Sequence, residues 1–245
     1  MQQYQSQYQS QTMARPRTEV VNAFMRGVYL WMTLGLGVTA LLAFGVDQSL
    51  GLKQFLFGSG FPYEANPTML YVLIFAELGL VMGLSFLINK MNPAVAMGLF
   101  LLYSALNGLT IGAILLFYSK AAVFQAFIAT AGMFAAMSAY GLLTKKDLTS
   151  WGSFLFMGLL GIIIASVVNI FIGSSTMSWI ISIIGVIVFT GLTAYDTQQL
   201  KIMGQTTDGA GDAAVKKATI MGALRLYLDF INLFLMLLRL LGGRE

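Results

Sequence analysis

The sequence contains neither cysteine nor histidine. Without cysteine, disulfides, thiolate nucleophiles, iron–sulfur clusters and cysteine-ligated zinc sites are excluded. Without histidine, a Ser-His-Asp triad, an HExxH metal site and an imidazole pH switch are excluded as well. Any proton chemistry in this protein must therefore use carboxylates, lysine or tyrosine.

Charged residues are also scarce, at 10% of the chain, whereas hydrophobic residues make up 58% and the mean hydropathy is +0.79. A soluble domain of 245 residues does not need so many apolar residues to fill its core. The composition therefore predicts an all-α integral membrane protein whose solvent is lipid. The formal net charge of +4 is interpreted as a topology signal, and nucleic acid is not expected as a partner.

Several apolar runs are long enough to cross a hydrocarbon core about 30 Å thick. They predict seven transmembrane helices at residues 28–46, 69–88, 94–118, 121–143, 152–172, 177–195 and 220–241. Turn residues or charges separate the runs, as at Asn92-Pro93 and in the polar stretch Gln198–Lys217, which predicts a loop. We expect residues 1–18, rich in Gln and Ser, to form a disordered polar tail and residues 19–245 to form one membrane domain.

The basic residues indicate how the chain is oriented, because Lys and Arg accumulate on the cytoplasmic side of membrane proteins. An odd number of spans places the two termini on opposite sides. The N-terminal side carries Arg15, Arg17, Arg26, Lys90, Lys145, Lys146, Lys201, Lys216 and Lys217, and the other side carries Lys53, Lys120 and Arg244. This predicts a cytoplasmic N-terminus. The absence of an N-x-Ser/Thr glycosylation site favours a bacterial inner (plasma) membrane.

Small residues in the third span form a GxxxG pattern at Gly108 and Gly112. In membrane helices this spacing lets two backbones approach closely. The pattern therefore predicts tight packing of the third span against a neighbouring helix, and no ligand role is assigned to it.

Three carboxylates lie in the spans, where an ionised side chain at the bilayer centre costs about 2.5–3.5 kcal/mol on insertion scales. Glu77 lies in the second span, Asp196 at the end of the sixth and Asp229 well inside the seventh. Arg225 and Asn232 lie four residues before and three residues after Asp229, on the same helical face. Asp229 is therefore either half of a structural ion pair with Arg225 or a titratable group that lines a cavity.

The predicted position of Asp196, near the C-terminal end of the sixth helix, is one where the helix macrodipole disfavours a carboxylate. Asp196 is therefore either a solvated helix end or a functional group. The sixth and seventh helices are antiparallel neighbours, so Asp196 and Asp229 can approach each other. A close pair would share one proton and titrate as a unit. Its oxygens also suit Ca²⁺, so proton loss and calcium entry could be linked.

The segments around these two aspartates, together with Thr144–Leu148, resemble the Bax inhibitor-1 family, also called the transmembrane Bax inhibitor motif family, and in particular its bacterial branch. The resemblance covers nearly all of the chain after the N-terminal tail. It implies a fold in which six helices wrap around a central C-terminal helix. It also implies a pH-sensitive calcium leak that is controlled by a di-aspartyl pair, which matches Asp196 and Asp229.

The same resemblance implies two further site residues. In the family, a basic residue near the cytoplasmic end of the second helix latches the closed pore, and Lys90 is the nearby candidate in this sequence. Glu77 matches a membrane carboxylate found in some relatives. We therefore treat Glu77, Lys90, Arg225 and Asn232 as candidate pore or latch residues, and Asp196 and Asp229 as the proton sensor and candidate calcium ligands.

Other functions are weighed against a leak. An intramembrane aspartyl protease also pairs Tyr-Asp on one helix with an aspartate on the next; Tyr195-Asp196 fits, but Tyr227-Leu228-Asp229 lacks the glycines of Gly-x-Gly-Asp. A retinal protein needs a lysine inside the last span, and residues 220–241 contain none. A regulator of other membrane proteins, such as a quality-control protease, remains compatible with the family. We predict a non-enzymatic protein without an organic cofactor, whose partners are the lipid bilayer, calcium ions and protons.

Overall fold

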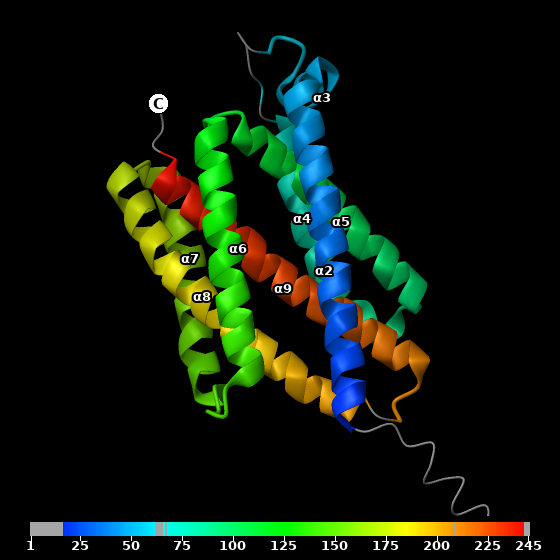
Figure 1. Cartoon of the computed structure of the whole chain (residues 1–245). Helices are drawn as coiled ribbons and strands as arrows, with labels where there is room; N and C mark the ends of the chain where they lie inside the picture. Colours follow the sequence, from blue (N-terminus) through cyan, green and yellow to red (C-terminus); the bar gives the residue numbers. More distant parts are fainter. Residues whose placement is uncertain (1–16, 62–65, 67, 208, 243–245) are drawn as a thin grey trace, which may run out of the picture.

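The computed structural model describes residues 17–61, 66, 68–207 and 209–242, and the regular secondary structure of these residues is entirely helical (Figure 1). The elements are α2 (Arg17–Gln48), α3 (Leu50–Phe57), α4 (Thr68–Leu87), the 3₁₀ turn η1 (Ile88–Lys90), α5 (Pro93–Leu115), α6 (Lys120–Leu143), α7 (Thr149–Ile172), α8 (Ser175–Thr206) and α9 (Asp212–Leu241). Among the described residues, seven helices are long and apolar enough to cross a membrane, as the hydropathy predicts.

Several helices begin or end at residues that satisfy the free backbone groups of a helix terminus. The Asn92 side chain accepts a hydrogen bond from the Ala94 N–H at 2.9 Å, and Pro93 takes the first position of α5. Ser119 and Ser174 cap α6 and α8 in the same way. Gly173, at φ 68°, ends α7 in the left-handed conformation that glycine tolerates. Local sequence chemistry therefore sets these boundaries.

The predicted loop over Gln198–Lys217 is wrong. α8 continues to Thr206 and α9 begins at Asp212, so most of this polar stretch is helical. The 32 residues of α8 extend for about 48 Å, which exceeds the hydrocarbon thickness of about 30 Å. Gln and Lys are good helix formers, so a change to polar residues ends the membrane-embedded part of the helix without ending the helix.

Two features near the N-terminal half of the chain also differ from expectation. α2 begins at Arg17, so residues 17 and 18 are helical, whereas residues 1–16 of the predicted tail lie outside the described residues. The short helix α3 was not predicted. Ser49 caps it by accepting the Leu52 N–H, and Leu56 and Phe57 bury its apolar side. A helix of two turns carries too little periodic signal to be recognised between two long apolar runs.

α9 is the central helix of the bundle (Figure 1). In the most apolar stretch of each helix, 67% of the α9 residues are buried but only 11% of the α7 residues. α2, α5, α6 and α8 pack directly against α9, while α4 packs against α5 and α7 packs against α8. The predicted seven-helix fold with a central C-terminal helix is therefore confirmed.

The GxxxG pattern packs α5 against α2. A Cβ added at Gly108 would lie 2.7 Å from the carbonyl oxygen of Thr39, and one added at Gly112 would lie 2.8 Å from the Cβ of Val46. Both distances are shorter than any normal contact of a Cβ atom, so the two backbones approach too closely for a side chain. The predicted packing role of these glycines is confirmed.

Candidate functional site

The carboxyl groups of Asp196 on α8 and Asp229 on α9 face each other where the two helices pack together, and we call them the aspartate pair. Asp229 lies in the middle of α9 with only 4% of its surface exposed, and Asp196 is half-buried. The Asp229 Oδ2 atom is buried, and no hydrogen-bond partner is found for it in the described part of the chain. The antiparallel packing of α8 and α9 therefore brings together the two residues that the sequence singled out.

The structure changes the interpretation of Asp196. Because α8 continues to Thr206, Asp196 does not lie at a helix C-terminus, and its predicted position there is wrong. The macrodipole acts mainly within the last turn, so it has little influence on this carboxylate. Asp196 instead faces Asp229 on the neighbouring helix. Its environment is therefore determined by the packing of α8 against α9 and not by its position within α8.

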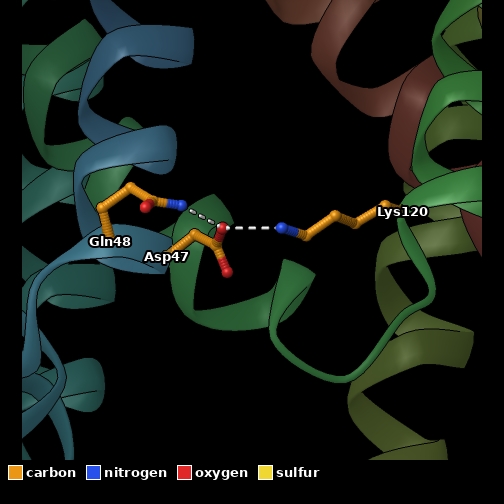
Figure 2. A network of polar contacts seen from close by, with 3 residues as sticks. All are labelled: Asp47, Gln48 and Lys120. Atoms are coloured by element: carbon orange, nitrogen blue, oxygen red, sulfur yellow. Dashed lines mark hydrogen bonds and ion pairs between the residues drawn. The ribbon is translucent and has the colours of Figure 1, made fainter.

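Arg225 lies one turn before Asp229 on α9, and its charge acts on both members of the aspartate pair. It does not form the direct Arg225–Asp229 ion pair that the sequence left open. Over the described ranges, the single ion pair within 4 Å joins Lys120 to Asp47 at 3.3 Å (Figure 2). Arg225 is largely exposed and acts on the aspartates from a longer distance.

Asn232 makes a local contact. Its amide donates a hydrogen bond to the Leu228 carbonyl oxygen at 2.8 Å, one turn back on the same helix. This bond holds the amide nitrogen of Asn232 against the backbone of α9. Although Asn232 lies only three residues after Asp229, this amide group therefore bonds its own helix and not the aspartate pair.

The chemistry open to the aspartate pair follows from its burial. Two carboxylates in contact repel each other when both are ionised, and a poorly solvated site makes each charge costly. A shared proton or a bound cation would reduce both penalties. Ca²⁺ usually takes about 6–8 oxygen ligands. Among the described residues, no group of three or more Asp or Glu side chains could hold a metal ion, so a resident calcium would need other ligands.

A second polar cluster lies between α4 and α5, and we call it the Glu77 cluster. The Thr110 hydroxyl donates to Glu77 Oε1 at 2.5 Å, and the Asn107 amide donates to Glu77 Oε2 at 3.3 Å. The same amide lies 3.2 Å from the Tyr103 hydroxyl, which accepts from it. Glu77 is therefore not left unpaired in the membrane, because the hydroxyl and amide groups of α5 solvate its carboxylate.

The Glu77 cluster continues to α9 through aromatic packing. The rings of Tyr103 and Tyr227 meet edge to face with centroids 5.8 Å apart. The Tyr227 hydroxyl lies 2.6 Å from the Thr39 hydroxyl, and Thr39 in turn donates to the Ser104 carbonyl oxygen at 2.9 Å. Since Thr39 has a single hydroxyl proton, Tyr227 is the donor of the first bond.

These partners of Glu77 and Tyr227 were missed at the level of sequence. The available signal was the presence of hydroxyl and amide side chains inside apolar runs. Such residues are common at helix contacts in membranes and do not reveal their partners. Only the arrangement of α2, α4, α5 and α9 shows that they join into one network.

On the side of the bundle where α2 begins, α8 also anchors the turn between α6 and α7. The buried Gln198 side chain accepts the Leu148 N–H at 2.8 Å and donates to the Lys146 carbonyl oxygen at 2.8 Å. Lys201 donates to the Leu142 carbonyl oxygen at 2.6 Å. These bonds lie within two turns of Asp196, so they fix the part of α8 that carries it.

Comparison with known proteins identifies the family. A sequence profile described as "Inhibitor of apoptosis-promoting Bax1" matches residues 21–245. The chain is 47% identical over 236 residues to "Inner membrane protein YbhL" of Escherichia coli K12, covering 96% of this chain and 97% of the relative. The chain belongs to the Bax inhibitor-1 family. An uncharacterized protein of Borreliella burgdorferi is 42% identical, and an uncharacterized membrane protein of Streptococcus pyogenes serotype M1 is 40% identical; each match covers 92% of this chain and 94% of the relative.

Membership of the Bax inhibitor-1 family and the seven apolar helices together make this a multi-pass bacterial membrane protein. The residue that the family resemblance suggested as a latch, Lys90, is the last residue of η1, and it is exposed. Among the described basic residues, Arg225 is the one whose charge acts on both aspartates of this Bax inhibitor-1 protein. The positive charge beside the aspartate pair therefore comes from α9.

Proposed function

We propose that this Bax inhibitor-1 family protein is a pH-sensitive calcium leak of the bacterial inner membrane, with the aspartate pair as its proton sensor. The observation that supports this proposal most strongly is the buried Asp229 carboxyl group, which faces Asp196 across α8 and α9. Ionisable groups inside a membrane protein commonly mark ion and proton pathways. A proton on the pair lowers its negative charge and hence its attraction for Ca²⁺, so protonation and calcium passage are coupled.

A leak fits the surroundings of Asp229 better than proteolysis does. An intramembrane aspartyl protease of the Gly-x-Gly-Asp type needs glycines so that a substrate backbone can approach. The corresponding positions here are Leu226, which is fully buried, and Leu228, which packs against the core. A substrate strand would therefore meet side chains beside this aspartate.

The test of the sensor is calcium flux into proteoliposomes, measured across a series of pH values. We expect Asp196→Asn to weaken the pH response of the flux, because the remaining Asp229 can no longer share a proton with a second carboxylate. Asp147→Asn is the matched control. Hydrogen bonds from the Thr149 side chain and backbone hold the pKa of the exposed Asp147 below its usual range, so this group stays ionised at neutral pH. A response in Asp196→Asn equal to that of the wild type and Asp147→Asn would contradict the proposal.

Glu77 is proposed as a cation contact of the same pathway. It is a half-buried carboxyl group inside the membrane domain, and two hydrogen-bond donors of α5 hold it in place. Ionisable groups inside membrane proteins commonly mark ion pathways. In the same assay, Glu77→Gln is expected to lower the flux at every pH while leaving its pH response in place. A flux equal to the wild type would remove Glu77 from the pathway.

We also propose that the N-terminus is cytoplasmic. The α4–α5, α6–α7 and α8–α9 connections share a side with the start of α2, and this side carries most of the basic residues. The chain contains no cysteine, so a single cysteine can be added without background labelling. A cysteine at Lys145 should resist a membrane-impermeant thiol reagent in intact spheroplasts, and one at Lys53 should react. The opposite labelling pattern would invert the topology.

A further inference from the structure

An apolar cavity of about 580 Å³ lies on the side of the bundle between α2 and α6. Ala40 and Phe44 of α2 and Phe124 and Phe127 of α6 form its walls, and Phe230 and Phe234 of α9 contribute to its floor. Its volume lies within the range of about 300–1,000 Å³ that is typical of ligand pockets. Because α2 and α6 are outer helices, the cavity opens toward the lipid.

The dimensions of the cavity match one leaflet of a bilayer. Its lining residues on α2 run from Leu36 to Asp47. At 1.5 Å per residue this stretch is about 16 Å long, or about half of a hydrocarbon core of about 30 Å. Asp47 lies at the end of α2 and Lys120 is the first residue of α6, so these two charged lining residues lie at the same end of the cavity.

These two charges form the ion pair that spans the gap between α2 and α6 (Figure 2). The Lys120 side chain is 88% exposed and the Asp47 side chain 37% exposed. Ion pairs this exposed contribute little to stability, so their partners exchange easily. The lysine offers a cation for a phosphate, and the aspartate offers an anion for an ammonium group.

We propose that the cavity binds one phospholipid with an ammonium headgroup, of the phosphatidylethanolamine type, from the leaflet opposite the N-terminus. One acyl chain lies along Phe44, Phe124 and Phe230, the phosphate binds Lys120 and the ammonium group binds Asp47. This lipid matches the cavity along its whole length. The apolar walls extend over about one leaflet and contact the acyl chain, and the two opposite charges at the outer end contact the headgroup. The argument for this lipid site does not rest on the proposed leak.

The test uses the full-length protein, which is extracted from nanodiscs that contain phosphatidylethanolamine and phosphatidylglycerol. Native mass spectrometry then identifies the lipids that the protein retains. We expect one retained phosphatidylethanolamine on the wild type. Ala40→Trp should fill the cavity and reduce this retention by about tenfold or more. Leu41→Trp is its matched control, because Leu41 is the adjacent residue, is 70% exposed and does not line the cavity.

The headgroup contacts are tested separately. Lys120→Gln should reduce retention by about tenfold through loss of a charge-assisted contact, whereas Lys53→Gln, the same change on the same side of the bundle, should not. The lipid site would be overturned if Ala40→Trp retained as much phosphatidylethanolamine as the wild type, or if a second copy of the protein were bound in place of the lipid. Equal retention of phosphatidylglycerol, or unchanged retention in Lys120→Gln, would overturn the headgroup assignment.

Discussion

Asp229→Asn is expected to abolish the pH response of calcium flux, and the double variant Asp196→Asn/Asp229→Asn is expected to show no further loss. Asp229 is the buried member of the aspartate pair, and an amide in its place cannot ionise. A sensor in which one proton is shared can change flux by up to about tenfold per pH unit, and this slope should become flat. Because the two carboxyl groups act as one titrating unit, their substitutions should be strongly non-additive.

The measurement is the double-mutant cycle of proteoliposome flux against pH. Asn232→Ala is the matched control on α9, because the Asn232 amide bonds the backbone of its own helix and not the aspartates. It should keep the wild-type slope. A slope that survives in Asp229→Asn, or effects of the two single variants that simply add, would show that the aspartates do not form the sensor.

Gly108→Ala is expected to lower the free energy of unfolding by about 1–3 kcal/mol, the usual cost of overpacking a close contact. The new Cβ would lie 2.7 Å from the Thr39 carbonyl oxygen and 2.8 Å from the Leu42 Cβ. A backbone carbonyl cannot move aside as the tip of a flexible side chain can, so α2 and α5 must separate. Separation would also stretch the Thr39 hydrogen bond to Ser104 on α5.

Gly98→Ala is the matched control for this substitution. Gly98 lies on the same helix, and an added Cβ there meets nothing within 4 Å. Its stability should be unchanged or slightly higher, because alanine favours the helix. The comparison uses denaturant unfolding of the two variants in the same detergent micelles. Equal unfolding midpoints for Gly98→Ala and Gly108→Ala would show that the α2–α5 contact tolerates a side chain.

The α2–α5 contact shows what a local sequence pattern can predict and what it cannot. The GxxxG spacing at Gly108 and Gly112 predicted a close helix contact, and the structure has one. The pattern could not name α2 as the partner helix, because every neighbouring span is apolar and offers a similar surface. Likewise, hydropathy alone identifies Asp229 as a residue inside a span. It predicts the wrong surroundings for Asp196, because the apolar run ends near Tyr195 whereas α8 continues to Thr206.

The sequence by itself determined the membrane class, the seven spans and the turn at Asn92-Pro93. These depend on hydropathy and on contacts within a few residues, which a local pattern records. Only the tertiary structure decided that Asp196 faces Asp229, that Glu77 binds Thr110, and that Arg225 acts without a direct ion pair. A helix that is apolar on all sides has no polar face from which its orientation could be predicted. Which side chains meet is therefore decided by how each helix is rotated and at what angle it crosses its neighbours.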